Sequence, residues 1–396
     1  MQIPLRTADS NIAGKVNFRS ERLGAILLVC ALQPMFAGAA DDEQAERESQ
    51  PVPGWDYAPD IRPDETRLKV QKGNFVAVPI PISNPTLGTG LVGGAAYFYG
   101  QTPEQKLVQP ASVTGVAGMY TDNDSKALGV AHQNYWDEDR WRLGAIVAMA
   151  DLRLQLLAPD GTSSGTAVDW VVEGLFSQLK FQREFGRDWY AGIGARYVDA
   201  EQAIDIEDLP DETATTDEIK TVGISLSADH DTRDMPLNSY SGHLFTVNAL
   251  FNDEAIGSEQ TYQSYSARYR SYHRVHEEVV VAWDVSACKR GGSTPLWDTC
   301  RLNLRGFSAT DYLGQVSAQG QVEGRWQLSK RWGVVGFAGF GWVNDTFNDI
   351  RENEAIPSYG VGVRFMVLPA KRVNVRLDYG WSVDNSAIHL SVGEAF

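Results

Sequence analysis

The sequence predicts an all-β protein, a transmembrane antiparallel β-barrel of about 16 strands. From Phe75 to the end, segments of about ten residues alternate apolar and polar side chains between turn signals. Connections between these segments alternate between short and long. Although 43% of the residues are hydrophobic, no stretch after residue 40 is long and apolar enough for a membrane helix. A barrel distributes its hydrophobicity in this way, because only every second residue of a strand meets lipid.

The alternation is clearest in the strand expected at 314–328. Val322 and Trp326 share one face of this strand, whereas Gln321, Glu323 and Arg325 share the other. One such strand would also fit a soluble sandwich, but the strands expected at 275–288 and 372–384 repeat the pattern with further charged residues. Charges that face inward on strand after strand would destabilise a sandwich core, whereas a hydrated lumen accommodates them.

The expected strands and their connections divide the barrel into two rims. Short connections follow the sixth, twelfth and fourteenth strands and predict the periplasmic rim, whereas long polar connections predict the extracellular rim. Tryptophans flank three of the short turns, as an interfacial girdle requires. An even strand count places both ends of the barrel at the periplasm. The expected ranges are 75–83, 88–99, 110–121, 125–136, 140–152, 168–182, 187–199, 217–230, 241–252, 259–272, 275–288, 314–328, 332–343, 359–368, 372–384 and 386–396.

The N-terminal segment predicts secretion. Basic residues precede the apolar run from Leu23 to Leu32, and Ala37-Gly38-Ala39 follows as a cleavage site, so residues 1–39 are expected to be a signal peptide. A membrane anchor is the alternative, but the run is shorter than the roughly 20 residues that a helix needs to cross a bilayer. Residues 40–73 are rich in charged residues and proline and lack a periodic apolar pattern that could bury one face. This composition predicts a flexible periplasmic leader before the barrel at 74–396.

Charge and cysteine content restrict the partners. The formal net charge of −16 argues against nucleic acid as a ligand and favours contact with outer-membrane lipid and lipopolysaccharide through bridging cations. Cys288 and Cys300 bracket the pair Gly291-Gly292 in an expected oxidising compartment. Two cysteines in that setting predict a structural disulfide.

The sequence Leu304-Arg305-Gly306-Phe307 stands in the long connection between the eleventh and twelfth expected strands. It resembles the V-R-G-F/Y signature of the BamA/TamA superfamily of outer-membrane assembly and translocation proteins (bacterial surface antigen barrels). The resemblance implies that the loop folds into the lumen and that Arg305 meets an acidic residue of the wall, for which Glu323 is the candidate.

Three further segments resemble the same superfamily. The stretch from Asp229 to Gly242 is similar to its D-x-R-x-x-x-P-x-x-G turn, and Pro79 to Gly90 is similar to its first hairpin. Phe396 resembles the aromatic residue of the outer-membrane assembly signal, which closes the last strand.

The chain also departs from the superfamily pattern. The segment 40–73 is too short for a polypeptide-transport-associated (POTRA) domain, so we expect a short, POTRA-less member. Gly339 stands where the superfamily has an aspartate in F-x-D-x-G, which leaves one expected wall carboxylate for Arg305 and predicts a more mobile loop.

Two functions remain open. The resemblance implies protein or lipid insertion or translocation at the bacterial outer membrane. The alternative is a closed barrel that acts as a pore, scaffold or homo-oligomeric membrane protein. The barrel assembly machinery is expected as a partner during biogenesis, together with a homodimer contact or a periplasmic partner.

Enzymatic readings are weaker. Residues 161–165 fit G-x-S-x-G but lie in a polar loop without the strand-turn-helix setting of that motif. His273 and His276 are spaced so that they fall on different faces of a strand, which does not favour a metal site. We therefore expect no catalytic residues, no metal and no cofactor.

Overall fold

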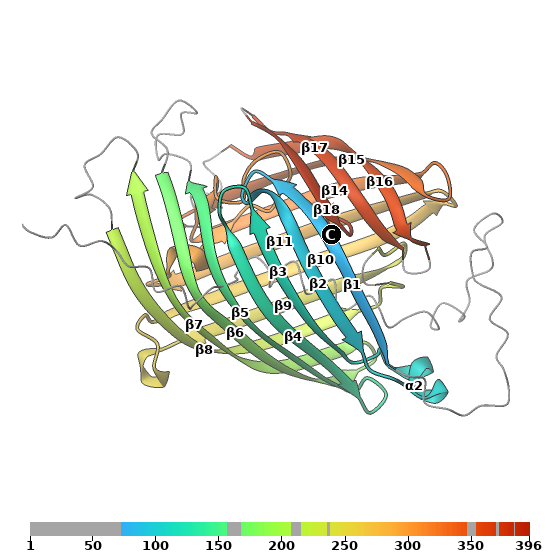
Figure 1. Ribbon diagram of the computed structural model, residues 1–396, viewed down its shortest axis with the longest axis horizontal. Coiled ribbons are helices and arrows are strands. Elements are labelled where there is room, and N and C mark those ends of the chain that lie inside the picture. Colours follow the sequence, from blue (N-terminus) through green and yellow to red (C-terminus); the bar gives the residue numbers. More distant parts are fainter. Residues whose placement is uncertain are drawn as a thin grey trace, which may run out of the picture.

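The computed structural model describes residues 73–156, 168–206, 215–235, 238–346, 354–369, 372–383 and 385–396. Sixteen antiparallel strands close into one barrel in chain order, and β1 lies beside β18 (Figure 1). Two further short strands, β12 and β13, pair with each other within the connection from β11 to β14. The predicted fold class is thus confirmed. The expected signal peptide and nearly all of the expected leader lie outside the described residues.

The element bounds differ from the expected ranges by a few residues in most places. The barrel strands are β1 (Asn74–Asn84), β2 (Gly88–Phe98), β3 (Val113–Thr121), β4 (Lys126–Trp136), β5 (Trp141–Leu156), β6 (Val168–Gly186), β7 (Trp189–Ile206), β8 (Thr215–Asp231), β9 (Gly242–Asn252), β10 (Tyr262–His276), β11 (Val279–Gly292), β14 (Val316–Gln327), β15 (Trp332–Asn344), β16 (Ile356–Leu368), β17 (Val373–Trp381) and β18 (Ser386–Val392). The other elements are α2 (Pro103–Val108), η3 (Glu254–Ile256), η4 (Leu296–Asp298), β12 (Cys300–Arg301) and β13 (Leu313–Gly314).

The pleat of β14 separates its two faces as the sequence predicts. Val322 and Trp326 are 45% and 52% exposed on the outer surface, whereas Glu323 and Arg325 are buried inside. Successive side chains of a strand point to opposite faces, so one phase of the alternation determines the orientation of the whole strand.

The two rims match the expectation in part, because the long β2–β3 and β8–β9 connections lie on the rim expected to be short and the short β1–β2, β3–β4 and β17–β18 connections lie on the other. The β4–β5, β6–β7, β10–β11, β14–β15 and β16–β17 connections are short and lie on one rim, which we call the short-turn rim. Trp141 stacks on Phe181 near this rim at a centroid distance of 5.2 Å, and Trp326 and Trp332 flank the β14–β15 turn. Within the described ranges, no helix has the length and apolar character to cross a membrane.

Two strand boundaries and one helix stand out among the differences from the expectation. The β10–β11 turn lies at residues 277–278, not near 273–274, because the β10 pairing continues to His276↔Val279. Apolar and polar residues continue to alternate through this region, so the alternation alone does not show where the turn lies. The helix α2, which Thr102 caps at its N-terminus, was not expected. The strand β18 ends at Val392, four residues before the expected end.

The inner surface of the barrel has two different halves. Charged residues line the inside of β14, β16 and β17, including Glu323, Arg325, Arg364 and Asp378, whereas β15 between them carries no charged residue. The inner positions of β3–β8, however, hold mainly small and apolar side chains, including Val113, Met119, Leu152, Val172 and Val198, all of which are buried. The expected inward charges are therefore concentrated in the C-terminal half, and β6–β8 contribute fewer of them, such as Lys180 with Asp229 and Arg196 with Asp298.

Candidate functional site

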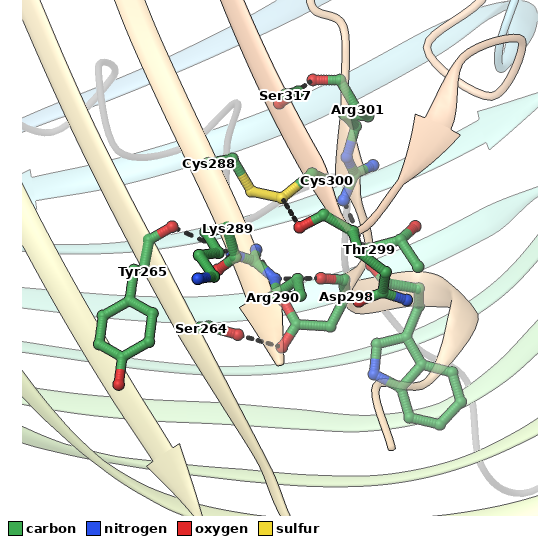
Figure 2. The surroundings of a disulfide bond; sticks show 12 residues. Ser264, Tyr265, Cys288, Lys289, Arg290, Asp298, Thr299, Cys300, Arg301 and Ser317 are labelled. Atoms are coloured by element: carbon green, nitrogen blue, oxygen red, sulfur yellow. Dashed lines mark hydrogen bonds and ion pairs between the residues drawn. A yellow bond between two sulfur atoms is a disulfide. The ribbon is translucent and has the colours of Figure 1, made fainter. Parts of the chain in front are cut away.

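The connection from β11 to β14, residues 293–315, enters the barrel; we call it the lumen loop. Its base is covalently attached to the wall by the disulfide between Cys288 of β11 and Cys300 of β12 (Figure 2). The two Cα atoms lie 5.7 Å apart. The cysteine pair expected from the sequence is thus bonded in the structure.

The short helix η4 attaches the loop both to β7 and to β11. Asp298 forms ion pairs with Arg196 of β7 and with Arg290 of β11, the latter at 3.3 Å (Figure 2 shows Arg290). Burial by itself would raise the pKa of Asp298, but the two guanidinium groups lower it to about 2. Trp297, next to it, packs against the apolar cluster of β3–β8. Sequence reasoning did not assign a role to either residue.

The tetrapeptide 304–307 points its side chains in two directions. Leu304 and Phe307 are buried with Leu302, and Phe307 meets Tyr312 edge to face at 4.8 Å. Arg305 turns the other way, toward the charged half of the wall. This division fixes the loop by apolar packing on one side and by ion pairs on the other.

Gly306 allows the loop to lie directly on β17. Its φ of +113° is unfavourable for any residue with a side chain, and a Cβ there would come within 2.9 Å of the Trp381 carbonyl group. A Cβ at Gly380, next to Trp381, would clash with the Gly306 nitrogen in the same way. The Gly306 N–H donates to His389 Nε2 of β18 at 3.3 Å, so the loop backbone touches the last strand directly.

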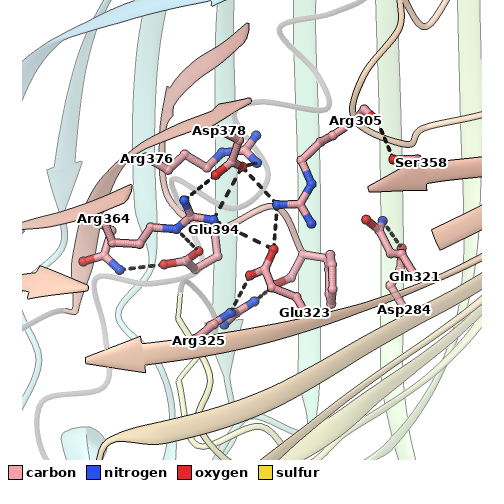
Figure 3. Close-up of polar contacts among 12 residues, drawn as sticks. Asp284, Arg305, Gln321, Glu323, Arg325, Ser358, Arg364, Arg376, Asp378 and Glu394 are labelled. Carbon is pink, nitrogen blue, oxygen red and sulfur yellow. Dashed lines mark hydrogen bonds and ion pairs between the residues drawn. The ribbon is translucent and has the colours of Figure 1, made fainter. Parts of the chain in front are cut away.

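Arg305 forms ion pairs with two wall carboxylates. Its Nη1 lies 2.6 Å from Glu323 Oε2 of β14 and 3.0 Å from Asp378 Oδ2 of β17 (Figure 3). Its guanidinium group also stacks over the Phe337 ring at 3.4 Å. We call Arg305, Glu323 and Asp378 the latch.

The pair with Glu323 is the one expected from the sequence, but the expectation of a single wall carboxylate was wrong. Asp378 lies on the predicted polar face of its strand, and only barrel closure brings it to Arg305. The alternation in that strand places Asp378 on the polar face, so the sequence could have suggested it as a candidate partner of Arg305. The alternation alone does not show which polar residue of that face reaches Arg305.

The latch continues toward the short-turn rim through two more arginines. Arg325 binds Glu323 at 2.8 Å, and Arg364 binds Asp378 at 2.5 Å and Glu394 at 2.7 Å (Figure 3). All these side chains are almost fully buried. One connected set of charges therefore links the lumen loop to the residues after β18.

The segment after β18 turns into the lumen. Gly393 has a φ of +92°, and beyond it Glu394 reaches Arg364. Phe396 packs against Tyr272 and accepts a hydrogen bond from Arg325 through its backbone oxygen at 2.8 Å. Phe396 was expected to close the last strand, but it lies outside β18. Its role as an assembly signal stays a prediction.

The β8–β9 connection, which contains the D-x-R resemblance, covers the same end of the lumen. Asp231 binds Arg233 at 2.8 Å, and Asp234 binds Arg372 of the β16–β17 turn at 2.6 Å. Asn238 Oδ1 accepts from Arg325 at 3.4 Å. The connection thus meets the latch network through Arg325.

The tip of the lumen loop reaches the first strands. Thr86, in the β1–β2 turn, has its hydroxyl 2.9 Å from that of Ser308 and accepts from the Ala309 N–H at 2.8 Å. Thr310 donates to the Gln155 carbonyl of β5 at 2.6 Å. Together with the His389 contact, these bonds connect the loop to both sides of the junction between β1 and β18.

That junction, which we call the seam, has the weakest pairing of the barrel. Its only register pair among the described residues is Ser83↔Leu390, whereas β1 pairs with β2 along its full length. In contrast, β5 and β6 pair continuously from Trp141↔Arg183 to Leu156↔Val168.

The enzymatic candidates gain no support. Residues 161–165 lie outside the described residues. His273 and His276 are both exposed on β10, and His273 bonds to Ser271 at 2.8 Å. Over the part of the chain that the structure describes, no group of three or more His, Cys, Asp or Glu side chains could hold a metal ion.

Comparison with known proteins gives a family match and a set of similar structures. A model of the Omp85 superfamily domain matches residues 115–396. The structure is similar to BamA from Haemophilus ducreyi lacking POTRA domains 1–3, with a TM-score of 0.55 and 12% identity over 82% of this chain and 70% of that chain. No curated protein sequence matches the chain.

Two CdiB structures are also similar. CdiB from Acinetobacter baumannii has a TM-score of 0.53 and 15% identity over 82% of this chain, which spans 60% of that protein's length. CdiB from Escherichia coli has a TM-score of 0.54 and 11% identity over 82% of this chain and 68% of that one. At such identities the similarity is one of fold.

Proposed function

The chain belongs to the Omp85 superfamily, and from that premise we propose that it resides in the bacterial outer membrane and passes polypeptide between its lumen and the bilayer through the seam. In this function the barrel acts without enzymatic chemistry. The short-turn rim faces the periplasm, and the outer apolar face meets lipid and lipopolysaccharide. The barrel assembly machinery inserts the chain itself.

The observation that carries the proposal is the single register pair of the seam in a barrel whose other strand junctions are extensively paired. Each backbone group left unpaired in a bilayer is costly, so a closed barrel normally pairs all its edges. A junction held at one register position opens at lower cost than any other. The lumen loop contacts both sides of it, at Thr86 and at His389, and so is placed to respond to opening.

The alternative function is a closed pore or scaffold. Among the described residues, the lumen loop, the β8–β9 connection and the segment 394–396 all occupy the interior, which disfavours an open pore. A scaffold would need neither a weak seam nor a loop that contacts both of its strands.

The test is to lock the seam with a disulfide between Ser83→Cys and Leu390→Cys, whose backbones are already in register. Purified protein in liposomes receives a urea-denatured outer-membrane barrel protein, and the folded fraction is measured by heat-modifiability on gels. We expect the oxidised variant to lose insertion activity and the reduced variant to regain it.

The matched control places the same crosslink in the continuous wall, at Ser227→Cys and Asn248→Cys between β8 and β9. It should leave insertion unchanged when oxidised. Wild-type protein with reductant controls for loss of the native disulfide. Full insertion by the oxidised seam variant would overturn the proposal and favour the scaffold.

A further inference from the structure

Two arginines of β10 face the lumen on the part of the wall that lies between the base of the lumen loop and the latch. Arg268 and Arg270 lie on the inner face of this strand, because inward and outward positions alternate from the buried Tyr262. The Arg268 side chain is 39% exposed. Lumen solvent therefore reaches this stretch of the wall, whereas Arg305 of the latch is buried.

The carboxylate directly opposite Arg270 is engaged by its neighbour. Asp284 of β11 is in register with Arg270. Arg268 nevertheless binds Asp284, with Nε donating to Oδ1 at 2.6 Å and Nη2 donating to Oδ2 at 2.9 Å. Gln321 donates to the same Oδ2 at 3.3 Å (Figure 3). Both oxygens of the acid that could have compensated Arg270 are thus already bonded.

The carboxylate on the other side of Arg270 is also engaged. Asp231 lies two strands away in the same row, and Arg233 binds it through Nε and Nη2, both at 2.8 Å. In the part of the chain that the structure describes, no carboxylate forms an ion pair with Arg270, and its Nε is buried without a hydrogen-bond partner. Three arginines thus face two aspartates in this group, which leaves one positive charge uncompensated.

This lack of a partner is an exception within the barrel. The other buried or half-buried arginines that point inward from the described strands each pair with a carboxylate, as Arg142 does with Asp139 and Arg364 with Asp378. Removing a charge from water is costly unless a counter-charge compensates it. Arg270 therefore lacks a counter-charge that a ligand can supply.

The surroundings indicate which anion fits. One uncompensated charge matches a monoanion, and the planar guanidinium group can donate to both oxygens of a carboxylate. Thr246 and Ser286 flank Arg268 in register, and Leu244 is the apolar residue beside Arg270. A lipid phosphate would bring acyl chains, for which one leucine on a hydroxyl-bearing wall is too small a lining. The site is better suited to a carboxylate on a polar polypeptide segment.

We propose that Arg270, with Arg268 beside it, forms a lumen site that binds the carboxylate of an acidic side chain in a substrate polypeptide. The site rests on the proposed function and deepens it, because it names a chemical group that the lumen recognises in the polypeptide. The preferred segment carries an acidic residue between small polar residues, which match the hydroxyl groups of Thr246 and Ser286.

The experiment measures peptide binding to purified barrel in nonionic detergent by fluorescence anisotropy. The probes are a labelled pentapeptide of threonine and serine with a central glutamate, blocked at both ends, and its glutamine analogue. We expect the glutamate peptide to bind on the order of tenfold more tightly, as one charge-assisted pair predicts. Arg270→Gln should make the two affinities equal. Arg187→Gln, which removes an exposed arginine at the short-turn rim, is the matched control and should preserve the difference.

Thermal unfolding without peptide tests whether Arg270 has a partner of its own. Arg270→Gln should leave the unfolding midpoint unchanged or raise it, whereas Arg233→Gln should lower it because Asp231 then loses its partner. An equal fall in the two variants would overturn the proposal.

The binding data can overturn it in three further ways: equal affinities of the wild type for the two peptides, a difference that persists in Arg270→Gln, or tighter binding of inorganic phosphate than of the glutamate peptide. The last result would assign the site to a small anion. Peptide binding is measured without insertion, so failure here leaves the proposed function standing, and failure of insertion leaves this site to be judged by its own affinities.

Discussion

The inner walls of β14–β17 and of β3–β8 both contain fully buried side chains, which are held by different means. Glu323 and Asp378 on the charged wall and Val113 on the apolar wall are all 0% exposed. On the charged wall, Glu323 and Asp378 are positioned by directional ion pairs with specific partners. On the apolar wall, positions depend on volume and on contact with Trp297 of the lumen loop.

This difference determines how each wall tolerates change. Removing one member of a buried ion-pair network leaves its partners charged and uncompensated, which costs more than the pair contributed. Replacing one apolar side chain by another of similar volume costs little. The lumen loop contacts both walls, so its position depends on both kinds of interaction.

The largest expected effect is from Glu323→Gln. This nearly isosteric change leaves Arg305 and Arg325 without their shared carboxylate and should destabilise the barrel by about 3–5 kcal/mol. Leu152→Met, equally isosteric on the apolar wall, should cost less than about 1.5 kcal/mol. Equilibrium unfolding in guanidinium chloride would measure both. Equal losses in the two variants would remove the contrast between the walls.

The next effect is from the pair Cys288→Ser and Cys300→Ser, which leaves only noncovalent contacts to hold the loop. The twelve-residue separation corresponds to about 3 kcal/mol in the chain-entropy model. Unfolding without reductant should show this loss, whereas protease protection of the loop should persist because Asp298 and Arg305 still anchor it. Rapid cleavage within residues 293–315 of the folded variant would show that the ion pairs alone cannot hold the loop.

The smallest expected effect is the loss of the Asp298 ion pairs at low pH. This effect distinguishes the ion pairs from the packing of Trp297 as the contacts that hold η4. The pKa of Asp298 is lowered from 3.8 to about 2, so its stabilisation is present above about pH 4 and is lost as the pH falls through 2. The shift corresponds to about 2 kcal/mol. Hydrogen exchange at η4 should therefore accelerate between pH 4 and pH 2, beyond the intrinsic change, in the wild type but not in Asp298→Asn. Identical acid profiles would mean that Trp297 packing alone fixes the helix.

The sequence by itself determined which way side chains point and which short segments matter. Alternation in β14 assigned Glu323 and Trp326 to opposite faces, because the pleat is a local property with a period of two. Cysteine spacing indicated the disulfide, and the resemblance of Arg305-Gly306 to a known signature indicated the lumen loop and one of its partners.

Only the tertiary structure decided which residues meet across the lumen. Asp378 is the second partner of Arg305 and Phe396 lies in the interior, because closure of the barrel brings β17, the lumen loop and the residues after β18 together. Contacts of this kind join residues far apart in the chain, and strand periodicity carries no information about which inner faces lie opposite one another.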